Sequence, residues 1–362
     1  MKTSGASLAL VGPVPPPFGG MANQVTLLLC MLRSAGVVVT PVSTNRSTPA
    51  LERLLAGIPG IRTAVRELFF LARLWRGGQR SEVLHVIACS HMYFFLHVVP
   101  AVLAARLLGR RVVVNYRGGE AARFFGSLGK FWLPVLRRAD TVTVPSGYLQ
   151  DVFQGLGVEA KIVPNIVETE SCAAIPRRPD SPRRFVCTRN LEPYYDVETL
   201  VQAFCFVHEQ LPDARLTLVG DGSRKPHIQR QLKALRLESD VILAGAVDPS
   251  RVPGHLAAAD IFVNASVVDN YPNAILEAFA CGLPVVTTSA GGIPYLVKDE
   301  VNGLLVKPRD PKALGEGMIR LAMDSELYAR LAEQGEHTAK QHSWAAIWPL
   351  LRKAYGWNGS TA

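Results

Sequence analysis

The sequence has no C-x-x-C pair, no G-x-G-x-x-G loop after its first apolar run and no D-x-D motif near a predicted strand end. The first absence argues against a zinc site of paired cysteines, and the second argues against a nicotinamide-dependent oxidoreductase. The six cysteines are scattered along the chain, and four of them lie in apolar runs. We therefore predict buried thiols in a reducing cytoplasm rather than a disulfide framework.

One long run lacks charged residues. Residues 83–105 contain no Asp, Glu, Lys or Arg and are long enough to cross a bilayer. The run divides into a strand and a buried helix and contains histidines, so we do not predict a membrane span. His85, His91 and His97 are six residues apart and share no helix or strand face, which argues against a metal site. The apolar run at 6–11 ends at prolines and is too short for a signal peptide.

Charge is distributed unevenly over the 362 residues. The net charge is +9, and residues 1–170 hold 18 Lys and Arg against nine Asp and Glu, whereas the remaining residues hold 21 of each. The length and the 48% of hydrophobic residues fit two globular domains. The asymmetry indicates that one domain meets an anionic partner, and nucleic acid, an anionic membrane surface and an acidic substrate are all open.

Short Val- and Ile-rich runs alternate with helical patterns along both halves of the chain. This alternation predicts an α/β fold with parallel sheets covered on both faces. We expect two Rossmann-like domains facing a cleft, at 1–168 and 185–342, joined by a Pro- and Arg-rich linker at 169–184. In such sheets ligands bind outside the carboxyl ends of the strands. The strands are expected at 7–13, 37–44, 83–88, 110–118, 140–146, 185–191, 214–222, 241–247, 261–266 and 284–289.

The segment 264–292 carries the clearest functional pattern. A strand is followed by a polar loop and by a helix that begins near Asn273, with Pro272 at its entrance. Backbone N–H groups at such a helix start can hold an anion. Glu277 lies one turn deeper on the same helix face, where a carboxylate can accept two hydrogen bonds from a cis-diol such as that of ribose. A helix cap or an ion pair is the alternative for Glu277.

The stretch D-N-Y-P-N-A-I-L-E-A-F-A-C-G-L-P-V-V resembles the signature of family 4 retaining glycosyltransferases of the GT-B fold. In that family two acidic residues are separated by seven positions. The first lies by the donor sugar, and the second binds the nucleotide ribose. Here these positions are Asp269, one methylene shorter than the family's Glu, and Glu277. The resemblance implies a metal-independent, retaining transferase whose donor also contacts Asn270, Tyr271, Pro272 and Asn273.

Further segments extend the resemblance over nearly the whole chain. The loop G-P-V-P-P-P-F-G-G resembles the N-terminal glycine loop of the family, which implies that the backbone at Gly19 and Gly20 approaches the donor phosphates. The G-D-G loop, with Gly220 and Gly222, implies a border of the nucleotide site. The segment 343–358 resembles a helix that returns to the N-terminal, acceptor-side domain.

One family site departs from the pattern. Arg189 matches an arginine that holds the diphosphate, but the Lys–Gly pair expected a few residues later falls on Tyr195 and Asp196. Either Lys225 or Arg224 from the G-D-G loop replaces the missing cation, or phosphate binding relies on Arg189 and helix N–H groups. An ordinary solvated lysine is the alternative for Lys225.

Two more candidates follow a strand of the first half. Arg117 lies where related enzymes often carry a histidine beside the donor sugar, and its guanidinium can clamp a phosphate or an acidic acceptor. Glu120 can contact an acceptor hydroxyl. A local Arg117–Glu120 pair at a helix start is the alternative. We take Asp269, Glu277, Arg117 and Glu120 as catalytic candidates, and we predict no metal and no cofactor.

Two segments mix basic and apolar residues. Residues 61–80 have the pattern of a basic amphipathic helix, and residues 123–138 are a second such segment. They predict contact with an anionic membrane surface from the cytoplasmic side. An ordinary helix with a solvated arginine face is the alternative. Because the basic residues are interleaved with apolar ones, we do not predict nucleic-acid binding.

The predicted function is sugar transfer from a nucleotide-diphosphate sugar to a glycan or lipid-linked acceptor in bacterial polysaccharide or glycolipid synthesis. A nucleotide-sugar epimerase on the same fold and a non-catalytic scaffold that has lost transfer are the alternatives.

Overall fold

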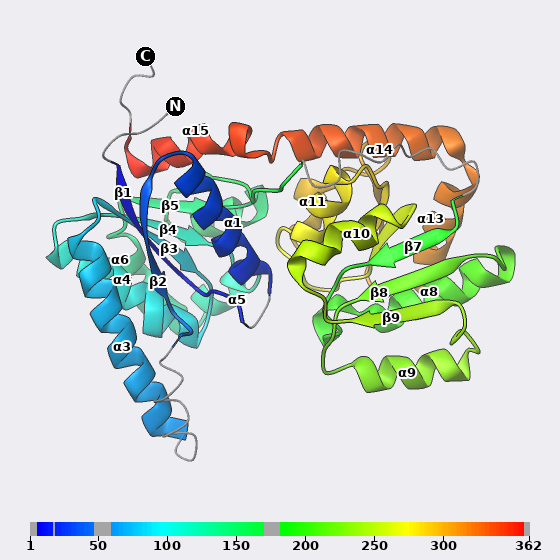
Figure 1. Ribbon diagram of the computed structural model, residues 1–362, viewed down its shortest axis with the longest axis horizontal. Coiled ribbons are helices and arrows are strands. Elements are labelled where there is room, and N and C mark those ends of the chain that lie inside the picture. The colour runs from blue at the N-terminus through cyan, green and yellow to red at the C-terminus, as the bar shows by residue number, and fades with distance from the viewer. Residues whose placement is uncertain (1–5, 17–18, 47–58, 170–181, 358–362) are drawn as a thin grey trace. The chain divides into compact units, whose positions relative to one another are not determined.

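The computed structural model describes residues 6–16, 19–46, 59–169 and 182–357, without the side chains of residues 59–62. The chain forms two compact units. The N-terminal unit consists of residues 1–166 and 347–362, and the C-terminal unit of residues 167–346. Most of the linker predicted at 169–184 lies outside the described residues. Each unit is built on a six-stranded parallel sheet, which confirms the predicted fold class (Figure 1).

The sheet of the N-terminal unit has the strand order β2-β1-β3-β4-β5-β6. Its central strands are runs of buried Val, Leu and Ala side chains, as a sheet covered on both faces requires. The predicted strands are all present, and the short edge strand β6 is an addition. The bounds are β1 Ser7–Gly12, β2 Val38–Ser43, β3 Val83–Ala88, β4 Arg111–Tyr116, β5 Thr141–Val144 and β6 Ala160–Ile162.

Helices cover both faces of this sheet. The connection through α1 runs from β1 to β2, whereas later connections run in the opposite direction across the sheet, so right-handed crossovers place α1 and α3–α7 on opposite faces. The bounds are α1 Gly20–Ser34, α3 Pro59–Gln79, the π-helical turn η1 Phe94–Val98, α4 Val99–Leu107, α5 Ala121–Phe125, the 3-10 turn η2 Leu128–Trp132, α6 Leu133–Leu136, α7 Gly147–Gly155 and α15 Trp344–Tyr355.

The structure confirms the expectation for the uncharged run at 83–105 and differs from the expectation for residues 123–138. The uncharged run at 83–105 forms β3, η1 and part of α4, and none of the helices in the described part of the chain is long and apolar enough to cross a bilayer. The expectation of one amphipathic helix over 123–138 is wrong, because the segment breaks into α5, η2 and α6. A Cβ at Gly129 would lie 2.6 Å from the Phe124 carbonyl oxygen, so only glycine permits the close turn between α5 and η2.

A buried polar layer joins α15 to the sheet of the N-terminal unit. The imidazole of His85 on β3 lies 2.7 Å from the Tyr355 hydroxyl, and the Thr141 hydroxyl on β5 donates to the Ala354 carbonyl at 3.3 Å. Both strand residues flank Val113 of β4, so they lie on one face of the sheet. Complete burial, assisted by the charge of Arg117, lowers the pKa of His85 to about 3, which keeps this ring neutral.

The C-terminal unit has the strand order β12-β11-β10-β7-β8-β9. Its strands are β7 Arg184–Cys187, β8 Arg215–Val219, β9 Val241–Gly245, β10 Ile261–Asn264, β11 Val285–Thr288 and β12 Leu304–Val306, of which β12 was not predicted. The helices are η3 Pro193–Tyr195, α8 Val197–Gln210, α9 Lys225–Ala234, η4 Pro249–Arg251, α10 Val252–Ala257, α11 Asn273–Ala280, α12 Ile293–Leu296, α13 Pro311–Met323 and α14 Ser325–Lys340.

The cysteines match the expectation of buried free thiols only in part. Cys187 is a buried free thiol, but Cys30 is exposed because it lies opposite the buried face of α1. Cys281 is buried and disulfide-bonded, so the prediction of a free thiol is wrong there. Cys172 lies outside the described residues.

The polar layer under α15 gives a stability prediction. Replacing Tyr355 with Phe should lower the free energy of unfolding by about 1–2 kcal/mol, because the His85 imidazole loses its hydrogen-bond partner inside the core. Urea titration followed by circular dichroism measures the change. The exposed Tyr194→Phe variant is the control and should unfold like wild type. An unchanged midpoint for Tyr355→Phe would show that this hydrogen bond does not anchor α15.

Candidate functional site

The predicted site residues of the C-terminal unit gather at the carboxyl ends of neighbouring strands. Arg189 follows β7, Gly220 follows β8, and Asp269 lies in the loop after β10. Because β10, β7 and β8 are adjacent and parallel, these three loops meet at one edge of the sheet. Open α/β sheets bind ligands at this edge.

Arg189 and Asp269 form a buried ion pair at this edge. The Nη2 atom of Arg189 donates to Oδ2 of Asp269, whose Oδ1 accepts the backbone N–H of Asn270 at 2.9 Å. Burial raises the pKa of Asp269, whereas the Arg189 charge lowers it. Burial also acts to lower the pKa of Arg189, but its anionic neighbours, led by Asp269, raise it overall. The Arg189 Nε–H has no partner in the described part of the chain.

An aromatic ring covers the guanidinium of Arg189. The guanidinium carbon lies 3.9 Å from the centre of the Tyr195 ring, which is close enough for a cation–π contact. Tyr195, which replaces the expected lysine, therefore contacts Arg189, the residue that matches the family's diphosphate-binding arginine. The next residue, Asp196, is the N-cap of α8 and has a left-handed conformation with φ 46°. Glycine, which the family pattern has at this position, adopts this conformation most readily.

The loop carrying Asp269 is wedged between two backbone segments. The N–H groups of Val267 and Val268 donate to the Tyr194 carbonyl on one side, and the Asp269 carbonyl accepts the Gly292 N–H at 3.0 Å on the other. A Cβ at Gly291 would lie 2.2 Å from the Asp269 carbonyl oxygen, and Gly291 has φ 53°. Only glycine permits this approach.

Helix α11 starts where the sequence predicted. Asn273 is its first residue and Pro272 its N-cap, without a side-chain cap. Glu277 lies on this helix, is half-buried and interacts electrostatically with Arg189. Burial raises the pKa of Glu277, and the Arg189 charge opposes this shift. Glu277, Asp269 and Arg189, chosen separately from the sequence, thus form one electrostatic group.

Tyr271 has a partner that the sequence did not indicate. Its hydroxyl lies 2.6 Å from Nε2 of His342, and Nδ1 of His342 faces the Thr338 carbonyl at 2.7 Å. Nδ1 thus carries a proton and Nε2 accepts the Tyr271 hydroxyl, since burial lowers the pKa of His342. Tyr271 therefore ties the site loop to the end of α14.

The two cations of the G-D-G loop are held locally. Lys225 pairs with Asp221 at 2.8 Å, and Arg224 pairs with Glu198. A Cβ at Gly220 would lie 2.3 Å from the Arg189 carbonyl, and one at Gly222 would lie 2.4 Å from the Leu191 carbonyl. These glycines let the loop pack against the chain that follows β7.

The N-terminal unit holds Arg117 inside a set of amide side chains. Its Nε donates to Asn115 at 2.9 Å, and its Nη1 donates to Asn165 at 2.7 Å and to Gln24 at 3.3 Å. Burial lowers the pKa of Arg117 to about 10, so the guanidinium is charged at neutral pH. The side chain is in place at the carboxyl end of β4, as expected, and is half-buried.

Glu120 pairs with a histidine rather than with Arg117. Its Oε2 lies 2.7 Å from Nε2 of His91, and Arg123 lies 3.8 Å away. The local Arg117–Glu120 pair considered from the sequence is therefore not formed. His91 has φ 63°, an uncommon conformation for a residue other than glycine.

The glycine loop after β1 is partly described. Gly19 is extended, starts α1 as its N-cap and has open space where a Cβ would lie, and Gly20 is the first helical residue. Residues 17 and 18 lie outside the described residues.

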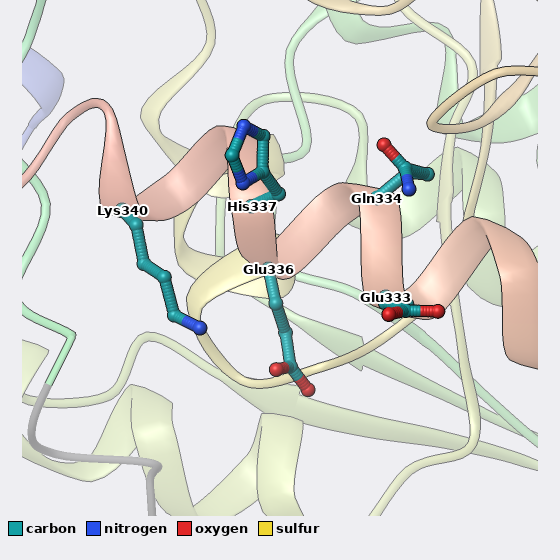
Figure 2. Close-up of a pocket in the computed structure, with 5 residues that line it drawn as sticks. All are labelled: Glu333, Gln334, Glu336, His337 and Lys340. Carbon is teal, nitrogen blue, oxygen red and sulfur yellow. The ribbon is translucent and has the colours of Figure 1, made fainter.

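In the described part of the chain, neither a cluster of metal-binding side chains nor the cavity beside α14 adds a residue to this site. Within residues 6–16, 19–46, 59–169 and 182–357, no group of three or more His, Cys, Asp or Glu side chains could hold a metal ion. A cavity of about 460 Å³ lies beside α14, where Figure 2 shows Glu336 and Lys340 on the same side of the helix. Its lining residues are Glu333, Gln334, Glu336, His337 and Lys340, none of which was predicted as a site residue.

Sequence reasoning missed the contacts of Tyr195, His342 and His91. The sequence did indicate a change at position 195, because Tyr195 stands where the family pattern has the lysine of its Lys–Gly pair. For His342 and His91 the sequence carried no signal, because their partners are 71 and 29 residues away.

Comparison with known proteins gives matches over most of the chain. A family model described as "Glycosyl transferases group 1" matches residues 182–324, and one described as "Glycosyltransferase Family 4" matches residues 18–171. The chain is 26% identical over 278 residues to the N-acetyl-alpha-D-glucosaminyl L-malate synthase of Bacillus anthracis, covering 72% of this chain and 70% of that protein.

Two further proteins extend the comparison. Over 264 residues the chain is 29% identical to the GDP-mannose-dependent alpha-(1-6)-phosphatidylinositol monomannoside mannosyltransferase of Mycolicibacterium smegmatis, covering 66% of this chain and 67% of that protein. The fold of the present chain matches the structure of Anabaena Alr3699/HepE in complex with UDP-glucose. The TM-score is 0.75 and the sequence identity 18%, and the match covers 96% of this chain and 99% of that one.

The glycine contacts beside Asp269 give a second stability prediction. Gly291→Ala and Gly292→Ala should each lower the free energy of unfolding by about 2–4 kcal/mol, because the new Cβ overlaps the carbonyl of Asp269 or Asn270. Gly254→Ala is the matched control, since its Cβ would meet nothing within 4 Å and α10 gains a better helix former. Chemical denaturation measures all three, and equal stabilities would rule out the wedge.

Proposed function

The chain belongs to the family 4 glycosyltransferases of the GT-B fold, and on that premise we propose that it is a retaining enzyme with a nucleotide-diphosphate sugar as donor. The acceptor in this proposal is a glycan or a lipid-linked sugar of bacterial polysaccharide or glycolipid synthesis. Support for the donor class comes from the relatives, one named as GDP-mannose-dependent and one solved with UDP-glucose.

The observation that carries the donor proposal is the unpartnered Nε–H of the buried Arg189. A buried N–H without an acceptor costs free energy, and a phosphate oxygen is the acceptor that an arginine edge fits best. Glu277 lies near enough to interact with the same guanidinium. Because a carboxylate accepts two hydrogen bonds, we assign Glu277 to the ribose hydroxyls of the donor.

The proposed reaction needs little acid–base machinery of its own. The bond between the anomeric carbon and the diphosphate oxygen breaks, and the acceptor oxygen attacks the same face of the sugar. The departing phosphate takes the acceptor proton. Arg189 and the N-terminus of α11 stabilise the negative charge on the leaving diphosphate, which is the largest charge change of the reaction. Asp269 orients Arg189 and, after the family pattern, lies beside the donor sugar.

The acceptor side is assigned to the N-terminal unit. Arg117 is held by three amide side chains, which orient its guanidinium. Such a guanidinium suits a phosphate or carboxylate of the donor or acceptor. Glu120, half-exposed and paired with His91, is assigned to an acceptor hydroxyl.

We extend this proposal to an anionic membrane surface that brings the unit to a lipid-linked acceptor. On α3 the buried residues Phe70 and Leu74 face the sheet, whereas Leu68, Leu71 and Trp75 are exposed at helical spacing. In η2, Phe131 is 70% exposed with Lys130 over its ring. Because α4 packs against both α3 and α6, the two segments flank one helix of the N-terminal unit. Exposed arginines of these segments, Arg76, Arg80, Arg123, Arg137 and Arg138, supply positive charge.

Removing the Glu277 carboxylate tests the donor proposal. Glu277→Ala should weaken UDP or GDP binding and lower turnover with the matching nucleotide sugar by about tenfold to a hundredfold, because two hydrogen bonds to a charged acceptor are lost. Calorimetry and a radiolabelled transfer assay measure both quantities.

The matched control is Glu333→Ala, an exposed carboxylate on α14 outside the site. It should bind and turn over like wild type. Near-normal donor affinity and turnover in Glu277→Ala would contradict the assignment.

The membrane surface gives a separate prediction. The protein should float with vesicles that contain phosphatidylglycerol and not with pure phosphatidylcholine vesicles, and raised salt should weaken binding. The double variant Leu71→Gln, Trp75→Gln should lose most of this binding, because it removes the apolar contact of α3. Ile242→Gln, which changes a residue exposed by 57% on β9, is the control and should float normally. Flotation that is independent of anionic lipid would refute the proposed surface.

A further inference from the structure

The guanidinium of Arg189 is held by two contacts of different geometry. The Tyr195 ring lies against its face at 3.9 Å, and the Asp269 carboxylate lies at its edge on Nη2. A stacked ring fixes the plane of a guanidinium, and an in-plane hydrogen bond fixes its rotation within that plane. Together the two contacts determine the direction in which every remaining N–H group can donate.

Tyr195 is itself anchored by the backbone around it. Its N–H donates to the Glu192 carbonyl at 2.9 Å, and its ring packs against the core of the C-terminal unit. The Tyr194 ring meets it edge-on at 4.5 Å, and the Tyr194 carbonyl accepts N–H groups from the loop that carries Asp269. The ring and the carboxylate that hold Arg189 are therefore connected through one short turn, η3.

We propose that Tyr195 is a positioning residue for the donor diphosphate. By fixing the guanidinium plane, its ring presents the free Nε–H of Arg189 to a phosphate oxygen while Nη2 stays on Asp269. The side-chain freedom that an arginine normally loses when it binds a ligand is already lost before the donor arrives, which increases affinity. This inference rests on the proposed donor-binding function and adds a residue that touches Arg189 rather than the substrate.

The test compares side chains with and without a ring at position 195. UDP, GDP, ADP and dTDP are titrated into the wild-type protein by calorimetry, and the tightest binder becomes the probe. Tyr195→Phe keeps the ring and should bind the probe within about twofold of wild type, whereas Tyr195→Leu and Tyr195→Met should bind about tenfold more weakly. Two ringless variants are used so that one remains if the other fails to fold.

Two controls separate positioning from packing. The matching nucleoside monophosphate should lose less affinity than the diphosphate in the ringless variants, because only the contact with Arg189 is disturbed, whereas a general loss of structure would weaken both equally. Phe206→Leu removes an exposed aromatic ring of α8 that has no role in the contacts of Arg189, and it should bind like wild type.

The outcomes distinguish this inference from the proposed function. Wild-type affinity in Tyr195→Leu and Tyr195→Met, or equal losses for monophosphate and diphosphate, would overturn the positioning role while leaving the donor proposal intact. A wild-type protein that binds none of the four nucleoside diphosphates would overturn both.

Discussion

The burial of the Arg189 charge is the constraint on which the candidate site depends. An arginine enclosed at the end of β7 is costly unless a carboxylate and further contacts compensate for its lost hydration. Asp269 supplies that carboxylate, but only because its loop lies between the Tyr194 carbonyl and the chain at Gly291. One buried charge thus links a strand end, a turn and a glycine pair that are far apart in the sequence.

The N-terminal unit holds its own buried arginine by different means. Arg117 donates to amide oxygens of Asn115, Asn165 and Gln24, and burial lowers its pKa to about 10. Amide dipoles fix the direction of a guanidinium while leaving its charge effective toward an anion, whereas a carboxylate partner competes with that anion. Each unit thus holds an oriented guanidinium, Arg117 through amide oxygens and Arg189 through a carboxylate and a ring. The basic excess lies in residues 1–170, which include Arg117.

The fold followed from the sequence to a large extent, and the site to a smaller one. Strands such as β3 and β4 consist mostly of buried apolar residues, so their positions were clear, whereas β6 and β12 are only three residues long and give a weaker signal. Glu277 and Arg189 were found because they lie in segments that resemble motifs of the family. The pairing of Arg189 with Asp269 spans 80 residues, and the stacking on Tyr195 depends on side-chain direction, so neither could be read from spacing.

The attachment of α15 has a consequence for how the chain is made. The N-terminal unit includes residues 347–362, and the partner of its buried His85 is Tyr355. On the ribosome, residues 167–346 emerge before that helix does. The C-terminal unit can therefore complete its core before α15 is available to pack on the sheet of the N-terminal unit. The sheet of the N-terminal unit is thus translated before the C-terminal unit, but its covering helix α15 is added after that unit.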